Sequence, residues 1–181
     1  MLGDENGRVP KTGKIPLPAN GTGKRIVESD DFNDTELKIN WQWNHNPVDD
    51  AWSLTERPGY LRLKTNRLAE NLYGARNTLT QRMEGPKCSG VVTMDVSQMK
   101  DGDVAGFSAF NGNSGLLSIL MDGDKKYLTM STNVVDLDNR SKAILGVEVE
   151  EKQRVALTQD IINLRIDCDF NLNQDIATFY Y

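Results

Sequence analysis

Short segments in which apolar and polar residues alternate, each followed by turn residues, place the strongest constraint on the fold of this chain. Residues 60–64, YLRLK, alternate with the period of a half-buried strand. Further along, Asp-Gly-Asp at 122–124 separates two such segments, 116–121 and 126–130, as in a β-hairpin. Turn signals recur roughly every 8 to 12 residues, which is typical of an antiparallel β-sandwich. We therefore predict an all-β fold.

Other segments of the sequence fit the same pattern of short strands. They are residues 25–29, 78–82, 88–96, 104–110, 143–150, 161–168 and 175–181. In VEVE at 147–150 the glutamates share one face and the valines the other. Glu148 and Glu150 are therefore expected on a solvated strand face rather than in a catalytic pair. Residues 136–145 are the one helical candidate, and their apolar periodicity is poor.

The length and charge of the chain argue against several classes of protein. Its 181 residues are enough for a single sandwich domain with a real core. Lys and Arg total 21 against 26 Asp and Glu, which gives a net charge of −5 and no basic surplus for nucleic acid. No apolar run is long enough to span a membrane. Residues 1–7 lack the basic and apolar regions of a signal peptide.

The two ends of the chain differ in composition from its middle. Residues 1–24 contain three Pro and five Gly without an apolar period, which is typical of a linker. We predict a linker over 1–24 and a β-sandwich over 25–181. Residues 176–181, IATFYY, are strongly β-prone and lack the polar tail of most chain ends. We therefore expect the sandwich to be incomplete at this end and to continue beyond Tyr181.

One stretch, residues 41–65, contains all three Trp residues of the chain and its only His. Its second half, 51–64, has Pro-Gly at its centre and predicts strand, tight turn and strand. Before that, 44–50 form a polar loop that follows two of the tryptophans. Indole rings stack on the apolar faces of sugars, and amides hydrogen-bond their hydroxyls. The stretch therefore has the composition of a sugar-facing surface.

Four motifs of this chain resemble a known family. They are DDF at 30–32, WQWNHNP at 41–47, WSLTERPGYLRLKT at 52–65 and ARNTLTQRMEGPKCS at 75–89. These motifs resemble the C-terminal, concanavalin-A-like β-sandwich of family 43 glycoside hydrolases, which are β-xylosidase and α-L-arabinofuranosidase-like enzymes. The resemblance runs from about residue 15 to the end of the chain.

The resemblance implies a jelly-roll sandwich that follows a catalytic propeller in a larger enzyme. In the family the propeller holds the catalytic carboxylates, so no catalytic residue carries over to this chain. The family sandwich also continues for several strands beyond the position of Tyr181, which agrees with the incomplete end expected above. The resemblance further implies a periplasmic or extracellular location, and plant arabinoxylan-type polysaccharide as the substrate of the parent enzyme.

Five residues are candidates for contact with the substrate rim or with a neighbouring domain. In the related enzymes the sandwich lends side chains to the rim of the active-site pocket, and by that resemblance we select Trp41, Trp43 and His45. Gln81 and Arg82 add an amide and a forked cation, which hydrogen-bond sugar hydroxyls or hold an interface together. For these two we favour the interface. For His45, a local hydrogen bond or contact with a partner domain is favoured over direct contact with substrate.

Other polar and aromatic side chains of this stretch have simpler explanations. Trp52 lies in an alternating segment and is expected in the core. Glu56 is the one carboxylate there that a partner could hold for acid catalysis, and we favour a surface or interface role. Asp49 and Asp50 are ordinary loop residues. His45 has no G-x-S-x-G nucleophile motif to serve, which argues against a serine hydrolase.

The sequence gives little support for a metal or cofactor. The chain has two cysteines, Cys88 and Cys168, and a single His, which argues against a zinc site. Buried free thiols are favoured, and a disulfide is the alternative if the two strands are neighbours. Paired aspartates at 30–31, 122/124 and 136/138 are hard ligands that suit calcium, but none forms a known calcium loop and turn roles are favoured. We expect no metal and no cofactor.

Three functions follow from these observations. The first is an accessory sandwich that stabilises a catalytic propeller and helps to shape its substrate entrance, while hydrolysis belongs to the propeller of the parent protein. The second is an independent carbohydrate-binding module that docks on xylan oligosaccharide by itself. The third is a purely structural sandwich whose aromatic stretch is all core and interface.

Overall fold

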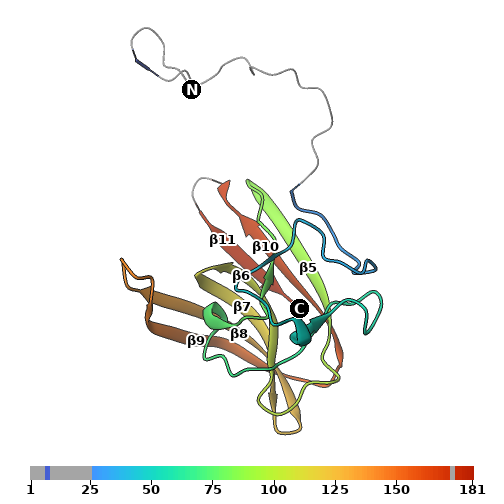
Figure 1. The fold of residues 1–181 in the computed structure, drawn as a ribbon. Helices are drawn as coiled ribbons and strands as arrows, with labels where there is room; N and C mark the ends of the chain where they lie inside the picture. The colour runs from blue at the N-terminus through green and yellow to red at the C-terminus, as the bar shows by residue number, and fades with distance from the viewer. Residues whose placement is uncertain (1–6, 9–25, 172–173) are drawn as a thin grey trace.

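The computed structural model describes residues 7–8, 26–171 and 174–181, and its regular structure is nearly all β. Two antiparallel sheets dominate, with strand orders β11-β10-β5 and β6-β7-β8-β9 (Figure 1). The strands are β5 (Lys87–Asp95), β6 (Val104–Asn111), β7 (Asn113–Asp122), β8 (Lys125–Leu137), β9 (Ile144–Leu157), β10 (Ile161–Asp169) and β11 (Ile176–Tyr180). This confirms the predicted all-β, antiparallel fold. No helix within the described residues has the length and apolarity needed to cross a membrane.

Hairpins connect the strands of the four-stranded sheet. Asp122 pairs with Lys125 across a two-residue turn, as the sequence predicts. The helix considered at 136–145 does not form, because β8 continues to Leu137 and turns back into β9. The turn closes when the Asp138 carboxylate accepts the backbone N–H groups of Arg140 at 3.1 Å and Ser141 at 2.7 Å. Local hydrogen bonds of this kind favour a turn over a helix.

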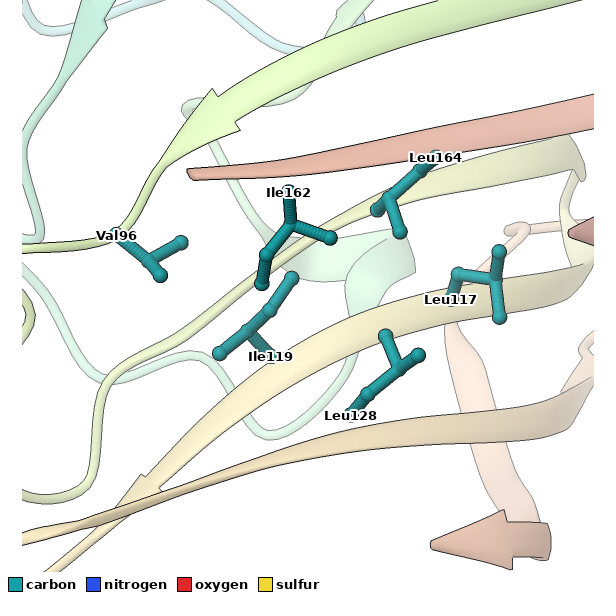
Figure 2. Packing of buried hydrophobic residues seen from close by; sticks show 6 residues of the cluster. All are labelled: Val96, Leu117, Ile119, Leu128, Ile162 and Leu164. Atoms are coloured by element: carbon teal, nitrogen blue, oxygen red, sulfur yellow. The ribbon is translucent and has the colours of Figure 1, made fainter. Parts of the chain in front are cut away.

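The core lies between the two sheets (Figure 2). Its buried members are Val96, Leu117, Ile119, Leu128, Ile162 and Leu164. Ile119 and Leu164 are 0% exposed and are the most deeply buried of the six. Alternate residues of β7 and β10 fill this layer. The same period of two identified these strands from the sequence. Burial of these side chains supplies the main stabilising free energy of the sandwich.

A glycine allows one aromatic ring to pack between the sheets. A Cβ atom at Gly115 of β7 would lie 2.5 Å from the ring of Phe179 on β11. Such a contact is too short for a real side chain, so glycine is required where this ring packs. Phe179 in turn contacts the core cluster. The β-prone segment near the end of the chain is thus packed into the sandwich.

The aromatic segment, residues 26–86, contains only very short strands and two single-turn helices. They are β1 (Gln42–Trp43), η1 (Asp49–Ala51), β2 (Trp52–Ser53), β3 (Arg62–Leu63), η2 (Leu72–Gly74) and β4 (Leu79–Thr80). β1 pairs with β4 and β2 pairs with β3, both antiparallel. The second pair confirms the predicted strand, turn and strand, and the turn is closed by the Tyr60 N–H on the Arg57 carbonyl at 3.1 Å. Gly59 within it has a φ of 80°.

Two expectations for the first part of the chain have different outcomes. The strand predicted at 25–29 is absent from its described part, 26–29, because the Glu28 backbone pairs with a side chain instead of a strand. The linker predicted over 1–24 lies outside the described residues, apart from 7–8.

The edge strand β9 is largely exposed. Glu148 and Glu150 are solvated, as predicted, and Val149 on the other face is also 59% exposed. Only the last residue of β9, Leu157, packs against the core cluster. The first half of this strand therefore adds little to the core.

Candidate functional site

Trp41 is held in place by an aspartate and a phenylalanine. Its Nε1 donates to Asp30 Oδ2 at 2.8 Å, and its ring stacks on Phe32 with centroids 5.6 Å apart. Lys38 Nζ lies 3.2 Å from the other Asp30 oxygen. Burial alone would raise the pKa of Asp30, but hydrogen bonds from the Phe32 N–H, Trp41 and Lys38 outweigh it and lower the pKa. Asp30 thus anchors this tryptophan through a charged hydrogen bond.

The other two tryptophans pack on each other. The rings of Trp43 and Trp52 have centroids 5.3 Å apart and are tilted by 55°. Both residues are half-buried, and Trp52, which was expected in the core, lies outside the core cluster between the sheets. Trp52 Nε1 is buried and has no hydrogen-bond partner among the described residues. The pair joins β1 to the β2–β3 hairpin.

His45 makes a local contact that leads toward the sandwich. Its Nε2 lies 2.7 Å from the Tyr73 carbonyl, so this nitrogen carries the donated proton. Asn44 Nδ2 donates to the same carbonyl at 3.1 Å. Tyr73 lies between His45 and Phe110, with ring centroids 6.4 Å from each. His45 is therefore exposed but fixed, and a chain of rings connects it to the end of β6.

Gln81 uses its amide to hold the beginning of the segment. Its Nε2 donates to the Glu28 carbonyl at 3.1 Å, and its Oε1 accepts the Glu28 N–H at 3.4 Å. Asn40 Nδ2 also donates to Oε1 at 3.3 Å. The side chain thus replaces a neighbouring strand as the partner of the Glu28 backbone, which accounts for the missing strand at 26–29.

An open groove of about 560 Å³ lies where β1 and β4 meet the ends of β6 and β10. Its polar lining includes Gln42, Asn44, Thr80, Gln81, Arg82 and Asn111, and its other walls are Met83, Gly85, Phe110 and Phe170. Within the described part of the chain, the side chains of Gln42, Arg82 and Asn111 have no hydrogen-bond or ion-pair partner. The groove therefore combines a free guanidinium and free amides with two aromatic rings.

The groove contains two of the five residues selected from the sequence. Gln81 and Arg82 line it, whereas Trp41, Trp43 and His45 do not. Sequence reasoning missed Gln42, Phe110 and the other lining residues. One signal was present, because Gln42 and Asn44 alternate with the tryptophans of 41–43 and so face the opposite side of the strand.

The carboxylates of the segment serve as ion-pair partners. Glu56 pairs with Lys64 and lies 3.4 Å from Arg62 Nε, which agrees with the surface role favoured for it. Asp95 at the end of β5 pairs with Arg57, and this hydrogen bond, with others from Ser97, lowers the pKa of Asp95 to about 2. The Arg57 guanidinium also lies 3.7 Å from the Tyr60 ring centroid. Arg57 therefore connects the Pro-Gly turn to the sandwich.

No group of three His, Cys, Asp or Glu close enough to hold a metal ion occurs among residues 7–8, 26–171 and 174–181. Of the aspartates weighed as calcium ligands, Asp30 holds Trp41 and Asp138 closes the β8–β9 turn. Cys88 and Cys168 are free thiols on neighbouring strands.

Known proteins similar to this chain are xylan-related enzymes. A β-xylosidase of Formosa agariphila is 39% identical over 121 residues, which cover 55% of this chain and 20% of that protein. A putative β-xylosidase of Xylanibacter ruminicola is 47% identical over 74 residues, which cover 41% of this chain and 14% of that protein. The chain thus spans a fifth or less of the curated relatives that it matches.

Solved structures of family 43 enzymes are similar to nearly the whole chain. A bifunctional GH43-CE protein of Bacteroides eggerthii matches with a TM-score of 0.79 and 40% identity, covering 97% of this chain and 22% of that one. An engineered GH43 glycoside hydrolase, described as both endo-xylanase and exo-arabinofuranosidase, matches with a TM-score of 0.81 and 30% identity, covering 98% and 35%. The family model for the β-xylosidase C-terminal concanavalin A-like domain matches residues 29–181. This chain therefore belongs to the family of C-terminal concanavalin A-like domains of family 43 β-xylosidase-like proteins.

Proposed function

We propose that this domain packs against a family 43 catalytic domain of the same protein and that its groove forms part of the substrate entrance. Hydrolysis belongs to the catalytic domain, and the sandwich supplies stability and contacts to the sugar chain. The small share of each relative that this chain covers supports a role as one part of a larger enzyme. The relatives' names support xylan-derived oligosaccharide as the substrate, at an extracellular or periplasmic location.

The groove is the observation that carries this proposal. Its volume of about 560 Å³ lies within the range of small-ligand sites. Arg82 and Gln42 present donors and acceptors that have no partner within the described residues, and such groups suit the hydroxyls of a sugar. The rings of Phe110 and Phe170 offer faces for CH contacts. Unpaired hydrogen-bonding groups beside aromatic rings are the elements of a carbohydrate subsite.

An entrance role is better supported than independent binding of xylan. A module that binds sugar alone is expected to display exposed aromatic platforms, but Trp41 is stacked on Phe32, and Trp43 and Trp52 are half-buried and pack on each other. The groove is open, so a second surface is needed to enclose a sugar. A neighbouring catalytic domain would supply that surface.

The experiment joins this chain to a family 43 catalytic domain and compares Arg82→Ala with Arg140→Ala. Arg140 is an exposed arginine in the β8–β9 turn, away from the groove. For an entrance, Arg82→Ala raises KM for xylo-oligosaccharides roughly 10- to 150-fold, the value of one charged hydrogen bond, and leaves kcat on aryl β-xyloside unchanged. Arg140→Ala changes neither.

Titration of the 181-residue chain alone with xylotetraose separates the alternatives. No measurable binding, together with the KM effect, supports the entrance role. Binding by the isolated chain that is lost in Arg82→Ala identifies an independent carbohydrate-binding module instead. No effect of Arg82→Ala in either experiment leaves a purely structural sandwich.

A further inference from the structure

Cys88 and Cys168 lie directly opposite each other on β5 and β10. Residues that face each other across an antiparallel pair point to the same side of the sheet, with Cα atoms about 4.5 to 5.5 Å apart. Disulfides join Cα atoms that are about 4.4 to 6.8 Å apart. The backbone register therefore already meets the distance requirement, although both residues are free thiols in the structure.

The two thiols differ in their surroundings. Cys168 is 7% exposed, and its Sγ donates to Met83 Sδ at 3.5 Å. Burial, and next the proximity of Cys88, raise the pKa of Cys168 to about 11. Cys88 is half-buried and so more accessible to a reagent in solution. In such an arrangement the accessible thiol reacts first with an oxidant, and the buried thiol then displaces the oxidant to form a disulfide.

We propose that Cys88 and Cys168 are a redox pair that closes into a cross-strand disulfide when it meets a disulfide oxidant such as oxidised glutathione. The Cys88 thiolate attacks the oxidant, which forms a Cys88–glutathione disulfide and releases one glutathione thiol. Cys168 then loses its proton to solvent and attacks Cys88 Sγ, which releases the second glutathione. Two protein thiols have given up two electrons and two protons, and one glutathione disulfide has been reduced.

The bond has two structural consequences. It closes a loop of roughly 80 residues, which restricts the unfolded chain and stabilises the folded one. It also removes the S–H that Cys168 donates to Met83, and Met83 lines the groove. Oxidation is therefore expected to stabilise the three-stranded sheet and to change the contacts of Met83 in the groove wall.

The test incubates the folded chain with oxidised and reduced glutathione and measures its intact mass. Closure lowers the mass by about 2 Da and leaves no thiol for a maleimide after denaturation. The midpoint of thermal unfolding of the oxidised chain rises by roughly 5 to 10 °C and returns on addition of dithiothreitol. The half-time of closure shortens as the pH is raised, because the Cys168 thiolate is needed in the second step.

Two variants complete the test. Cys88→Ser and Cys168→Ser each keep one thiol, show no loss of mass and gain no thermal stability from oxidised glutathione. Circular dichroism confirms that each variant is folded, and the measurement on the unsubstituted chain does not depend on them. Two free thiols in excess oxidised glutathione, a stable glutathione adduct at Cys88, or a disulfide between two chains would each overturn the proposal.

Discussion

The sandwich and the aromatic segment are held together by different forces. In the sandwich, alternate residues of long strands are buried between two sheets, and Leu164 is 0% exposed. In residues 26–86 the strands are two residues long, and specific polar contacts such as Trp41 to Asp30 fix the chain. Non-directional burial tolerates many sequences, whereas a hydrogen bond to a buried charge depends on one atom.

This difference explains where the candidate site lies. The groove is bounded by β1 and β4 of the segment and by the ends of β6 and β10 of the sandwich. The sandwich supplies rings at rigid positions, and the segment supplies amides and a guanidinium on short strands. Functional groups on loops that a rigid scaffold positions are a common arrangement in binding proteins.

The largest effect is expected from a cavity in the core. Leu164→Ala removes a side chain that is 0% exposed and lowers the free energy of unfolding by about 3 to 4 kcal/mol. Ile161→Ala on the same strand is the matched control, because Ile161 is 49% exposed and its loss costs under about 1 kcal/mol. Urea denaturation measures both. Equal losses would show that β10 does not form the centre of the core.

A smaller loss is expected from the polar anchor of the segment. Trp41→Phe keeps a ring on Phe32 but removes the hydrogen-bond donor to Asp30. Because the Asp30 side chain is 4% exposed, we expect the free energy of unfolding to fall by about 2 kcal/mol. Trp43→Phe is the control, because the Trp43 ring packs on Trp52 and its side chain makes no hydrogen bond within the described residues. Thermal unfolding of the two variants gives the comparison. If Trp43→Phe were the more damaging, ring packing rather than the anchor would hold the segment.

The link between the segment and β5 should appear in the response to acid. The pKa of Asp95 is about 2 in the folded chain, below its value when unfolded, so its pairing stabilises the fold above about pH 4 and is lost as the pH falls toward 2. Arg57→Ala removes the main cause and should weaken this pH dependence, as measured by urea midpoints across that range. Arg154→Ala is the control, because its partner Glu151 lies on the same strand. An unchanged acid profile in Arg57→Ala would show that the turn is not coupled to the sheet.

The sequence predicted local features of this fold better than its long-range polar contacts. The β7–β8 hairpin was predictable because alternation and an Asp-Gly turn occur within a few residues. The Gln81 side chain hydrogen-bonds the Glu28 backbone, 53 residues away in the sequence, and no sequence pattern predicts such a contact. The groove likewise joins Gln42, Phe110 and Phe170, which only the packing of the two regions brings together.

The smallest effect on stability, and the most informative about function, is expected at Arg82. This guanidinium lines the groove without a partner among the described residues, so Arg82→Ala should change the free energy of unfolding by less than about 0.5 kcal/mol. A loss of 2 kcal/mol or more, about that of the Trp41 variant, would place Arg82 in the framework that holds the two regions together. An unchanged free energy of unfolding together with a raised KM for xylo-oligosaccharides would instead identify Arg82 as a ligand-binding residue. Both measurements can be made on Arg82→Ala. A side chain that contributes no stability to either region is available to bind a ligand in the groove between them.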